Sequence, residues 1–180
     1  MKAFGKTLLF FITIASVCGI TACTSHSPSD FSYRQKAFAL QAEGNRWGEP
    51  LLCDIYCENG AWKTISYHAP DPLDGITVTA QEDGSLLILG KGLSATIPQD
   101  TPTALGLTLP ARILLLDQVA APRRISVQRI STGDLFSLSL PSEDQPITLA
   151  IGSDGAPLHA SGAYFSFRFS PLSDPHSPAK

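Results

Sequence analysis

The sequence has few charged residues and no excess of positive charge. Charged side chains make up 16% of the 180 residues, hydrophobic ones 43%, and the net charge is −3. Disordered chains combine few apolar residues with high charge, so this composition excludes disorder. Nucleic-acid binding normally needs a clustered basic footprint, whereas this chain is mildly acidic and its basic residues are mostly scattered. We therefore expect one folded domain with a substantial core and no nucleic-acid partner.

Sequence motifs for catalysis are also missing. The chain contains no Gly-x-Ser-x-Gly elbow, no Walker loop and no His-Glu-x-x-His sequence. His68, close to Asp71 and Asp74, is the nearest approach to an acid–base group, and solvated polar side chains at a strand end explain it better. His159 and His176 have the same explanation. We therefore expect a protein that is not an enzyme and that uses no cofactor or metal.

Long apolar runs are absent except at the N-terminus. Lys2 and Lys6 precede an apolar stretch from Leu8 to Val17, which is too short to span a bilayer comfortably. No later stretch approaches the roughly 18 apolar residues of a spanning helix. A basic start followed by a short apolar run is typical of an export signal, which we place at residues 1–22.

The four residues Ile20-Thr21-Ala22-Cys23 follow the apolar run. They resemble the lipobox of bacterial lipoproteins, which implies that the Cys23 thiol carries a diacylglyceryl group, with acyl chains such as palmitate, and becomes the new N-terminus. Two acyl chains anchor stably, at about 0.8 kcal/mol for each buried CH₂. Residues 23–30 are then the lipidated cysteine and a flexible tether, and the protein is held at the extracytoplasmic face of the cell membrane. A secretory signal cut after Ala22 or near Ser25 is the alternative.

Apolar and polar residues alternate along residues 31–170, which we take as the folded domain, before a polar tail at 171–180. Alternation predicts strands with one buried face. The inward residues of these strands are Phe38, Leu40, Ala42, Cys53, Ile55, Cys57, Ile65, Tyr67, Ile76, Val78, Ala80, Phe136, Leu138, Leu140, Ile147, Leu149, Ile151, Phe165, Phe167 and Phe169. Turn signals separate them at residues 58–60, 82–84, 131–133 and 153–155. Their regular spacing favours an antiparallel meander over βαβ units.

Residues 103–120 follow a different period. Spacings of three and four predict a helix with an apolar stripe of Leu105, Leu109, Ile113, Leu116 and Val119. Pro110 suits the first position of a final helix, and Pro122 ends it. Such a helix has to cover a sheet face to bury its leucines. We therefore predict a mainly β (α+β) fold, a curved antiparallel half-barrel with one Leu-rich helical lid. A short helix is also predicted between Phe31 and Phe38, capped by Ser29 or Asp30.

Aromatic, proline and glycine positions form a further pattern between residues 65 and 93. Its members are Ile65, Tyr67, Pro70, Leu73, Gly75, Ile76, Gly84, Gly92 and Leu93. This pattern resembles the central block of LolA-like lipoproteins of Gram-positive bacteria, including the germination lipoprotein GerS group. The resemblance implies a LolA-like half-barrel over about residues 38–169. The arginine and lid contacts of enterobacterial LolA and LolB are not matched residue by residue, so their carrier activity is not implied.

The predicted half-barrel leaves two functions open. In the first, an apolar groove between helix and sheet holds a lipid or acyl chain. Its lining would be Leu109, Ile113 and Leu116 of the helix, with Ile65, Tyr67, Ile76 and Val78 of the strands. In the second, the core is filled and the protein acts through surface contacts, as a structural or regulatory partner in an envelope complex. The GerS resemblance implies such a role in spore germination.

The two cysteines Cys53 and Cys57 lie four residues apart on a predicted strand. Their Cα atoms would be roughly 13 Å apart, beyond the ~7 Å limit for a disulfide. We expect two small buried side chains. A metal pair or an intermolecular disulfide is the weaker alternative.

Two groups of surface residues complete the candidates. Arg123 and Arg124, with Arg112 and Arg129 nearby, form the one basic cluster, which suits either a solvated junction or a contact with anionic lipid head groups. Trp47 and Trp62 stand near predicted turns. They suit either contacts with a partner or covers for the open end of the sheet.

Overall fold

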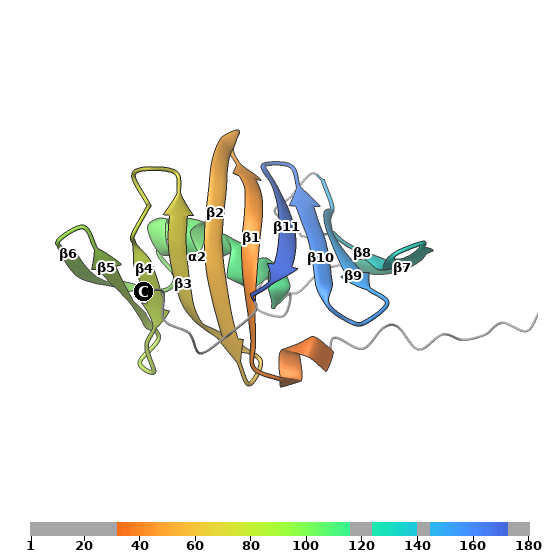
Figure 1. The fold of residues 1–180 in the computed structure, drawn as a ribbon, viewed down its shortest axis with the longest axis horizontal. Coiled ribbons are helices and arrows are strands. Elements are labelled where there is room, and N and C mark those ends of the chain that lie inside the picture. Colours follow the sequence, from red (N-terminus) through yellow and green to blue (C-terminus); the bar gives the residue numbers. More distant parts are fainter. Residues whose placement is uncertain (1–31, 116–123, 140–144, 173–180) are drawn as a thin grey trace, which may run out of the picture.

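The computed structural model describes residues 32–115, 124–139 and 145–172. Within these ranges, eleven antiparallel strands form one open, curved sheet (Figure 1). The strands are β1 Phe38–Arg46, β2 Glu49–Glu58, β3 Ala61–Ala69, β4 Thr77–Ala80, β5 Ser85–Gly90, β6 Leu93–Pro98, β7 Arg124–Ile130, β8 Gly133–Ser139, β9 Ile147–Gly152, β10 Pro157–Gly162 and β11 Phe165–Pro171. The helical segments of the described residues are the 3₁₀ helix η1, Ser32–Gln35, and the α-helix α2, Pro102–Leu114.

The first and last strands meet in the middle of the sheet. The strand order is β6-β5-β4-β3-β2-β1-β11-β10-β9-β8-β7. β1 pairs antiparallel with β11, which places Leu40 opposite Pro171 and Arg46 opposite Phe165. Each half of the sheet is a meander of hairpins, and β6 and β7 lie at the two edges. The predicted mainly β fold, antiparallel meander and curved sheet with one α-helix are therefore confirmed.

The helix α2 lies across one face of the sheet, behind β1, β2 and β3 in Figure 1. Thr101 caps its N-terminus, since the Thr101 side chain accepts a hydrogen bond from the Ala104 backbone N–H at 3.3 Å. Pro102 follows as the first helical residue, where a missing N–H costs nothing. No helix within the described ranges is long and apolar enough to cross a membrane.

Two details of the predicted helix are wrong. Pro110 does not begin a helix but lies inside α2, buried against the sheet. The buried face also differs from the predicted stripe, because Leu105 is 38% exposed. The buried residues of α2 are instead Ala104, Thr108, Pro110, Ala111, Ile113 and Leu114. Three of these are small: Ala104, Thr108 and Ala111. Leu116, Val119 and Pro122, and the predicted inward residue Leu140, lie outside the described residues.

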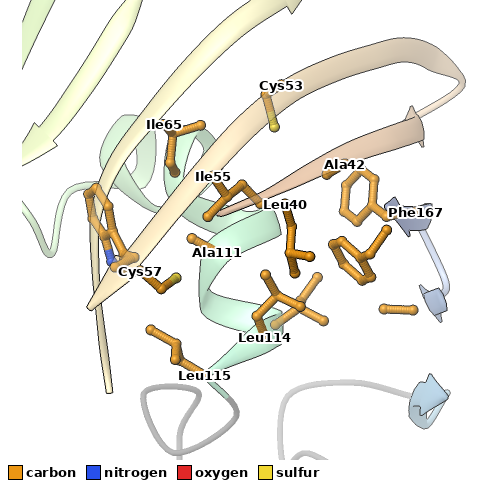
Figure 2. Packing of buried hydrophobic residues seen from close by; sticks show 14 of the residues in the cluster. Leu40, Ala42, Cys53, Ile55, Cys57, Ile65, Ala111, Leu114, Leu115 and Phe167 are labelled. Carbon is orange, nitrogen blue, oxygen red and sulfur yellow. The ribbon is translucent and has the colours of Figure 1, made fainter. Parts of the chain in front are cut away.

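The core lies between α2 and the sheet and extends into both halves. On β2, buried side chains alternate with partly exposed ones, as the sequence predicts. Figure 2 shows Ile55 and Cys57 of β2 on the side that faces Ala111 and Leu115. Phe167 of β11 belongs to the same buried cluster, so one core connects the two meanders.

The short and edge elements depart most from the expectations. η1 is a single 3₁₀ turn, shorter than the predicted helix, and Tyr33 Oη donates a hydrogen bond to the Leu114 carbonyl at 2.6 Å. Alternation does not predict β5, β6, β7 or β10. β6 has no buried residue, and residues 126–129 of β7 are all exposed. Edge strands with little burial leave no period of two in the sequence.

Candidate functional site

The interface between α2 and the sheet contains most of the predicted groove residues. Ile65 and Val78 are fully buried, and Tyr67 and Ile113 keep only 1% of their surface exposed. A side chain that lines a hollow would keep area accessible to a water-sized probe, so these four pack against their neighbours instead. Ile76 is 7% exposed and Leu109 is half-buried against the same core. The seventh predicted residue, Leu116, lies outside the described residues.

Two polar side chains of the sheet bind backbone carbonyls of α2. Because Pro110 has no N–H, the Gly106 carbonyl four residues earlier lacks its usual helical donor. Arg46, the last residue of β1, donates from Nη1 to this carbonyl. Tyr67 Oη of β3 donates to the next carbonyl, that of Leu107. The proline in the middle of the helix thus exposes a backbone acceptor, and the sheet supplies the donor that satisfies it.

The buried groups of this interface are held in their neutral forms. Burial raises the pKa of Cys57 from 9.0 to about 12. Burial, followed by the charge of Asp54, raises the pKa of Cys53 to about 12. Burial is also the main cause of the raised pKa of Tyr67. Neither thiol is in a disulfide, and both are too buried and too weakly acidic to act as nucleophiles. The prediction of two small buried cysteines is confirmed.

An exposed aromatic pair marks one end of the sheet. Trp47 occupies the two-residue turn between β1 and β2, and Tyr164 occupies the turn between β10 and β11. Each side chain is 62% exposed. The Trp47 backbone N–H donates to the Tyr164 carbonyl at 2.7 Å, which joins the two turns. We call this region the aromatic end. Trp62, the other tryptophan, is 2% exposed and belongs to the core, so of the two alternatives left open for it the contact with a partner does not apply.

Two pockets open at the aromatic end, and Trp47 lines both. One, of about 220 Å³, lies between the start of β2 and the loop after β3. Its lining is Arg46, Trp47, Glu49, Pro50, Leu51, Pro70 and Leu73. The other, of about 510 Å³, is a shallow groove toward β10 and β11. Its lining is Asn45, Trp47, Gly48, Ser161, Gly162, Ala163, Tyr164, Phe165 and Ser166. We call the second one the neutral groove, because none of these residues carries a charge.

His68, the residue considered as an acid–base group, pairs with Asp54 rather than with Asp71 or Asp74, which are near it in sequence. His68 Nε2 lies 2.8 Å from Asp54 Oδ2, on the neighbouring strand β2. Gln41 Nε2 of β1 donates to the other carboxylate oxygen of Asp54 at 3.1 Å. The three side chains link adjacent strands on the face of the sheet opposite the core, which is a structural arrangement.

Metal ligands and basic residues give no further site in the described ranges. Those ranges contain no group of three or more His, Cys, Asp or Glu side chains that could hold a metal ion. In the predicted basic cluster, Arg129 pairs with Asp134 at 3.1 Å, and burial lowers the pKa of Arg112. Arg123 and the side chain of Arg124 lie outside the described residues.

Tyr164 is the main residue of the aromatic end that sequence reasoning missed. The Trp47-Gly48 pair is recognisable as a turn, but Tyr164 follows a Ser-Gly-Ala stretch with no pattern of its own. What joins them is the pairing of β1 with β11, strands more than a hundred residues apart in the chain. A tyrosine directly before the Phe165 strand was the one local signal.

Taken together, the fold defines an open, curved antiparallel sheet with one helix packed across its face. The sequence matches no protein-family model and no curated protein at a significant level. Among solved structures, this chain is similar to an uncharacterized conserved protein from Thermus thermophilus, with a TM-score of 0.52 and 14% sequence identity. The match covers 79% of this chain and 83% of the other. At this identity the likeness concerns the fold alone.

Proposed function

We propose that this chain is a lipid-anchored LolA-like protein of the extracytoplasmic membrane face, without catalytic activity, and that it acts as a structural or regulatory partner in an envelope complex. The observation that carries the proposal is the filled interface between α2 and the sheet. Ile65, Val78 and Ile113 are buried to 1% exposure or less, which supports a packed rather than a hollow interface among the described residues. Binding then takes place at the outer surface.

The anchor in this proposal rests on the N-terminal sequence. Lys2 and Lys6, the short apolar run and Ala22-Cys23 are the parts of a lipoprotein signal. Replacing Cys23 by Ala should release the protein into the medium. Retention of the Cys23→Ala protein in the membrane would contradict the anchor while leaving the binding role open.

Native mass spectrometry of the fragment from Ser25 to Lys180, purified from cells, tests the binding role. The proposal expects the bare mass of the chain, with a stoichiometric protein partner retained at low salt. A copurified lipid mass would instead support the other candidate, carriage of a lipid or acyl chain.

Acyl carriage has its own observation in its favour. Leu107 and Leu109 are only half-buried at the margin of the core, and Leu105 beside them is exposed. An acyl chain could contact these leucines if α2 moved away from the sheet. Under this second candidate, Arg46→Ala, which removes a tie between sheet and helix, should increase the binding of a fluorescent fatty acid. Unchanged, negligible binding in both proteins would favour the filled core.

A further inference from the structure

The backbone at Trp47 is in a conformation that tryptophan rarely adopts. Trp47 has φ 53°, and Gly48, which follows it, has φ 81°. A two-residue hairpin turn with two positive φ values favours Asn-Gly, and a bulky residue in the first position is an outlier. Asn59 and Lys91 occupy the same position in two other hairpins of this chain, each followed by glycine. The turn therefore does not need an aromatic residue, and such outliers concentrate where a side chain has a function.

The Trp47 ring does not stabilise the core either, because most of it is exposed. The Arg46 guanidinium lies 4.9 Å from the centroid of the Trp47 ring. It therefore covers one face of the indole. The rest of the ring lines the neutral groove with Tyr164. The hydrogen bond between the Trp47 backbone N–H and the Tyr164 carbonyl holds the two turns that carry these aromatic residues next to each other.

The neutral groove combines these rings with uncharged polar groups. Asn45 is exposed and makes no hydrogen bond to another described side chain that would occupy its amide. Ser166 Oγ lies 3.1 Å from His159 Nε2, and Ser161 Oγ lies 2.7 Å from Thr148 Oγ1. Each hydroxyl has three hydrogen-bonding positions, so both retain capacity for a ligand. The groove therefore offers flat aromatic surface and neutral donors and acceptors.

We infer that the neutral groove binds an uncharged saccharide chain, with a sugar ring stacked on Trp47. A pyranose presents an apolar C–H face to an aromatic ring and hydroxyl groups around its edge. The electron-rich ring face attracts the slightly positive C–H groups, while Asn45 and the serines meet the hydroxyls. The inference needs no protein partner, and only the orientation of the groove relative to the membrane rests on the proposed anchor.

Other ligand classes fit the neutral groove less well. An acyl chain would leave the Asn45 amide and the serine hydroxyls without partners, which is unfavourable once they are covered. An anionic head group would call for Arg or Lys in the lining, and the lining contains neither.

Insertion into the membrane is disfavoured by the position of the groove. η1, to which the N-terminal segment leads, lies at the opposite end of β1 from Trp47 (Figure 1). The nine residues of β1 separate the two ends by about 30 Å. A protein tethered through its N-terminus can therefore present the aromatic end away from the membrane.

The inference is tested by titrating the full chain with N-acetylglucosamine tetramer and with cellotetraose. The titration is done in a detergent that has no sugar head group. Tryptophan fluorescence should change on binding of at least one of them, with a Kd on the order of 1 mM or tighter. Measured by isothermal titration calorimetry, which does not depend on Trp47 as the reporter, Trp47→Asn should weaken binding about tenfold or more, and Asn45→Ala about fivefold. Lys91→Asn, in a turn of the same kind away from the groove, should leave binding unchanged.

Stability separates this role from a structural one. Because Asn suits a positive φ better than Trp does, Trp47→Asn should unfold at the same temperature as the wild type or higher. A substantially lower unfolding temperature would show that Trp47 stabilises the fold and would overturn the inference. Failure of both sugars to bind the folded wild type at about 10 mM, or binding that survives Trp47→Asn, would overturn it as well.

Discussion

Cys53 and Cys57 place two thiols in the core, and burial raises the pKa of each from 9.0 to about 12. In the unfolded chain the thiols ionise near pH 9, whereas in the folded chain they stay protonated to a much higher pH. Between these values the folded state binds more protons, so the free energy of unfolding falls as pH rises. Below pH 9 the contribution is fully present.

The predicted result is a loss of stability above pH 9 that depends on the thiols. Each thiol should contribute a slope of up to about 1.4 kcal/mol per pH unit, and Tyr67, whose pKa is also raised by burial, adds to it at higher pH. Urea denaturation at pH 7, 9, 10 and 11 measures the slope. The double variant Cys53→Ala/Cys57→Ala should be less stable at pH 7 but decline less steeply. Equal slopes in the two proteins would contradict the burial of the thiols.

Gly44 on β1 is required for a close approach to β11 rather than for a turn. A Cβ at this position would lie 1.8 Å from the Ser166 carbonyl oxygen, and backbone cannot move aside as a flexible side chain can. Gly44→Ala should therefore destabilise by roughly 2–3 kcal/mol or more.

A matched control for that variant is Gly106→Ala in α2, where the nearest atoms lie at 3.9 Å or beyond. Alanine favours a helix over glycine by about 1 kcal/mol, so Gly106→Ala should stabilise slightly. Thermal unfolding of both variants provides the comparison. A Gly44→Ala protein as stable as the wild type would contradict the pairing of β1 with β11 at this position.

At the scale of elements, the strands could be predicted from the sequence more accurately than the helix. A buried strand face forces a period of two, and β2 has the predicted alternation. The stretch that forms α2 is apolar on nearly every side, so its period does not determine which side is buried. The small residues Ala104, Thr108 and Ala111 fit against the sheet, while Leu105 stays exposed.

The role of Pro110 could not be predicted for a related reason. A proline inside a helix is unfavourable unless something satisfies the carbonyl that it leaves without a donor. Here the donor is Arg46, 60 positions away on β1. Local sequence contains no information about such a partner. The aromatic end shows the same limit, because the Trp47 turn was predictable and its neighbour Tyr164 was not.

A double-mutant cycle tests the tie between sheet and helix. Arg46→Ala leaves the Gly106 carbonyl without a donor and should destabilise by about 1–3 kcal/mol. Pro110→Ala restores an N–H four residues after Gly106, which can bond the carbonyl within the helix. Arg46→Ala should therefore cost about 1 kcal/mol less when combined with Pro110→Ala. Urea denaturation of the four proteins measures the coupling. Strict additivity would mean that Arg46 stabilises through another contact, such as its stacking on Trp47.

At the scale of the whole molecule, the pairing of β1 with β11 joins two meanders into one sheet. One buried cluster spans both halves, with Trp62 and Ile65 in the first and Phe136 and Phe167 in the second. Neither meander can cover its apolar face alone, because the cluster is shared and α2 belongs to the first half of the chain. The two halves should therefore fold and unfold together.

Phe167→Ala tests this cooperativity, because Phe167 is fully buried next to the seam and its ring stacks on Phe165 at 5.4 Å between centroids. Truncation of a buried phenylalanine costs about 3–5 kcal/mol. Although Phe167 lies in the second half, fluorescence of Trp62 in the first half, measured in a Trp47→Asn background so that Trp62 is the sole tryptophan, should report a denaturation midpoint lowered as much as the one from far-UV circular dichroism. Val127→Ala on the edge strand β7, where the side chain is 46% exposed, should change stability by no more than about 0.5 kcal/mol. An unchanged Trp62 midpoint beside a biphasic circular dichroism curve would mean that the halves unfold separately, and the shared core would then not control the stability of the molecule.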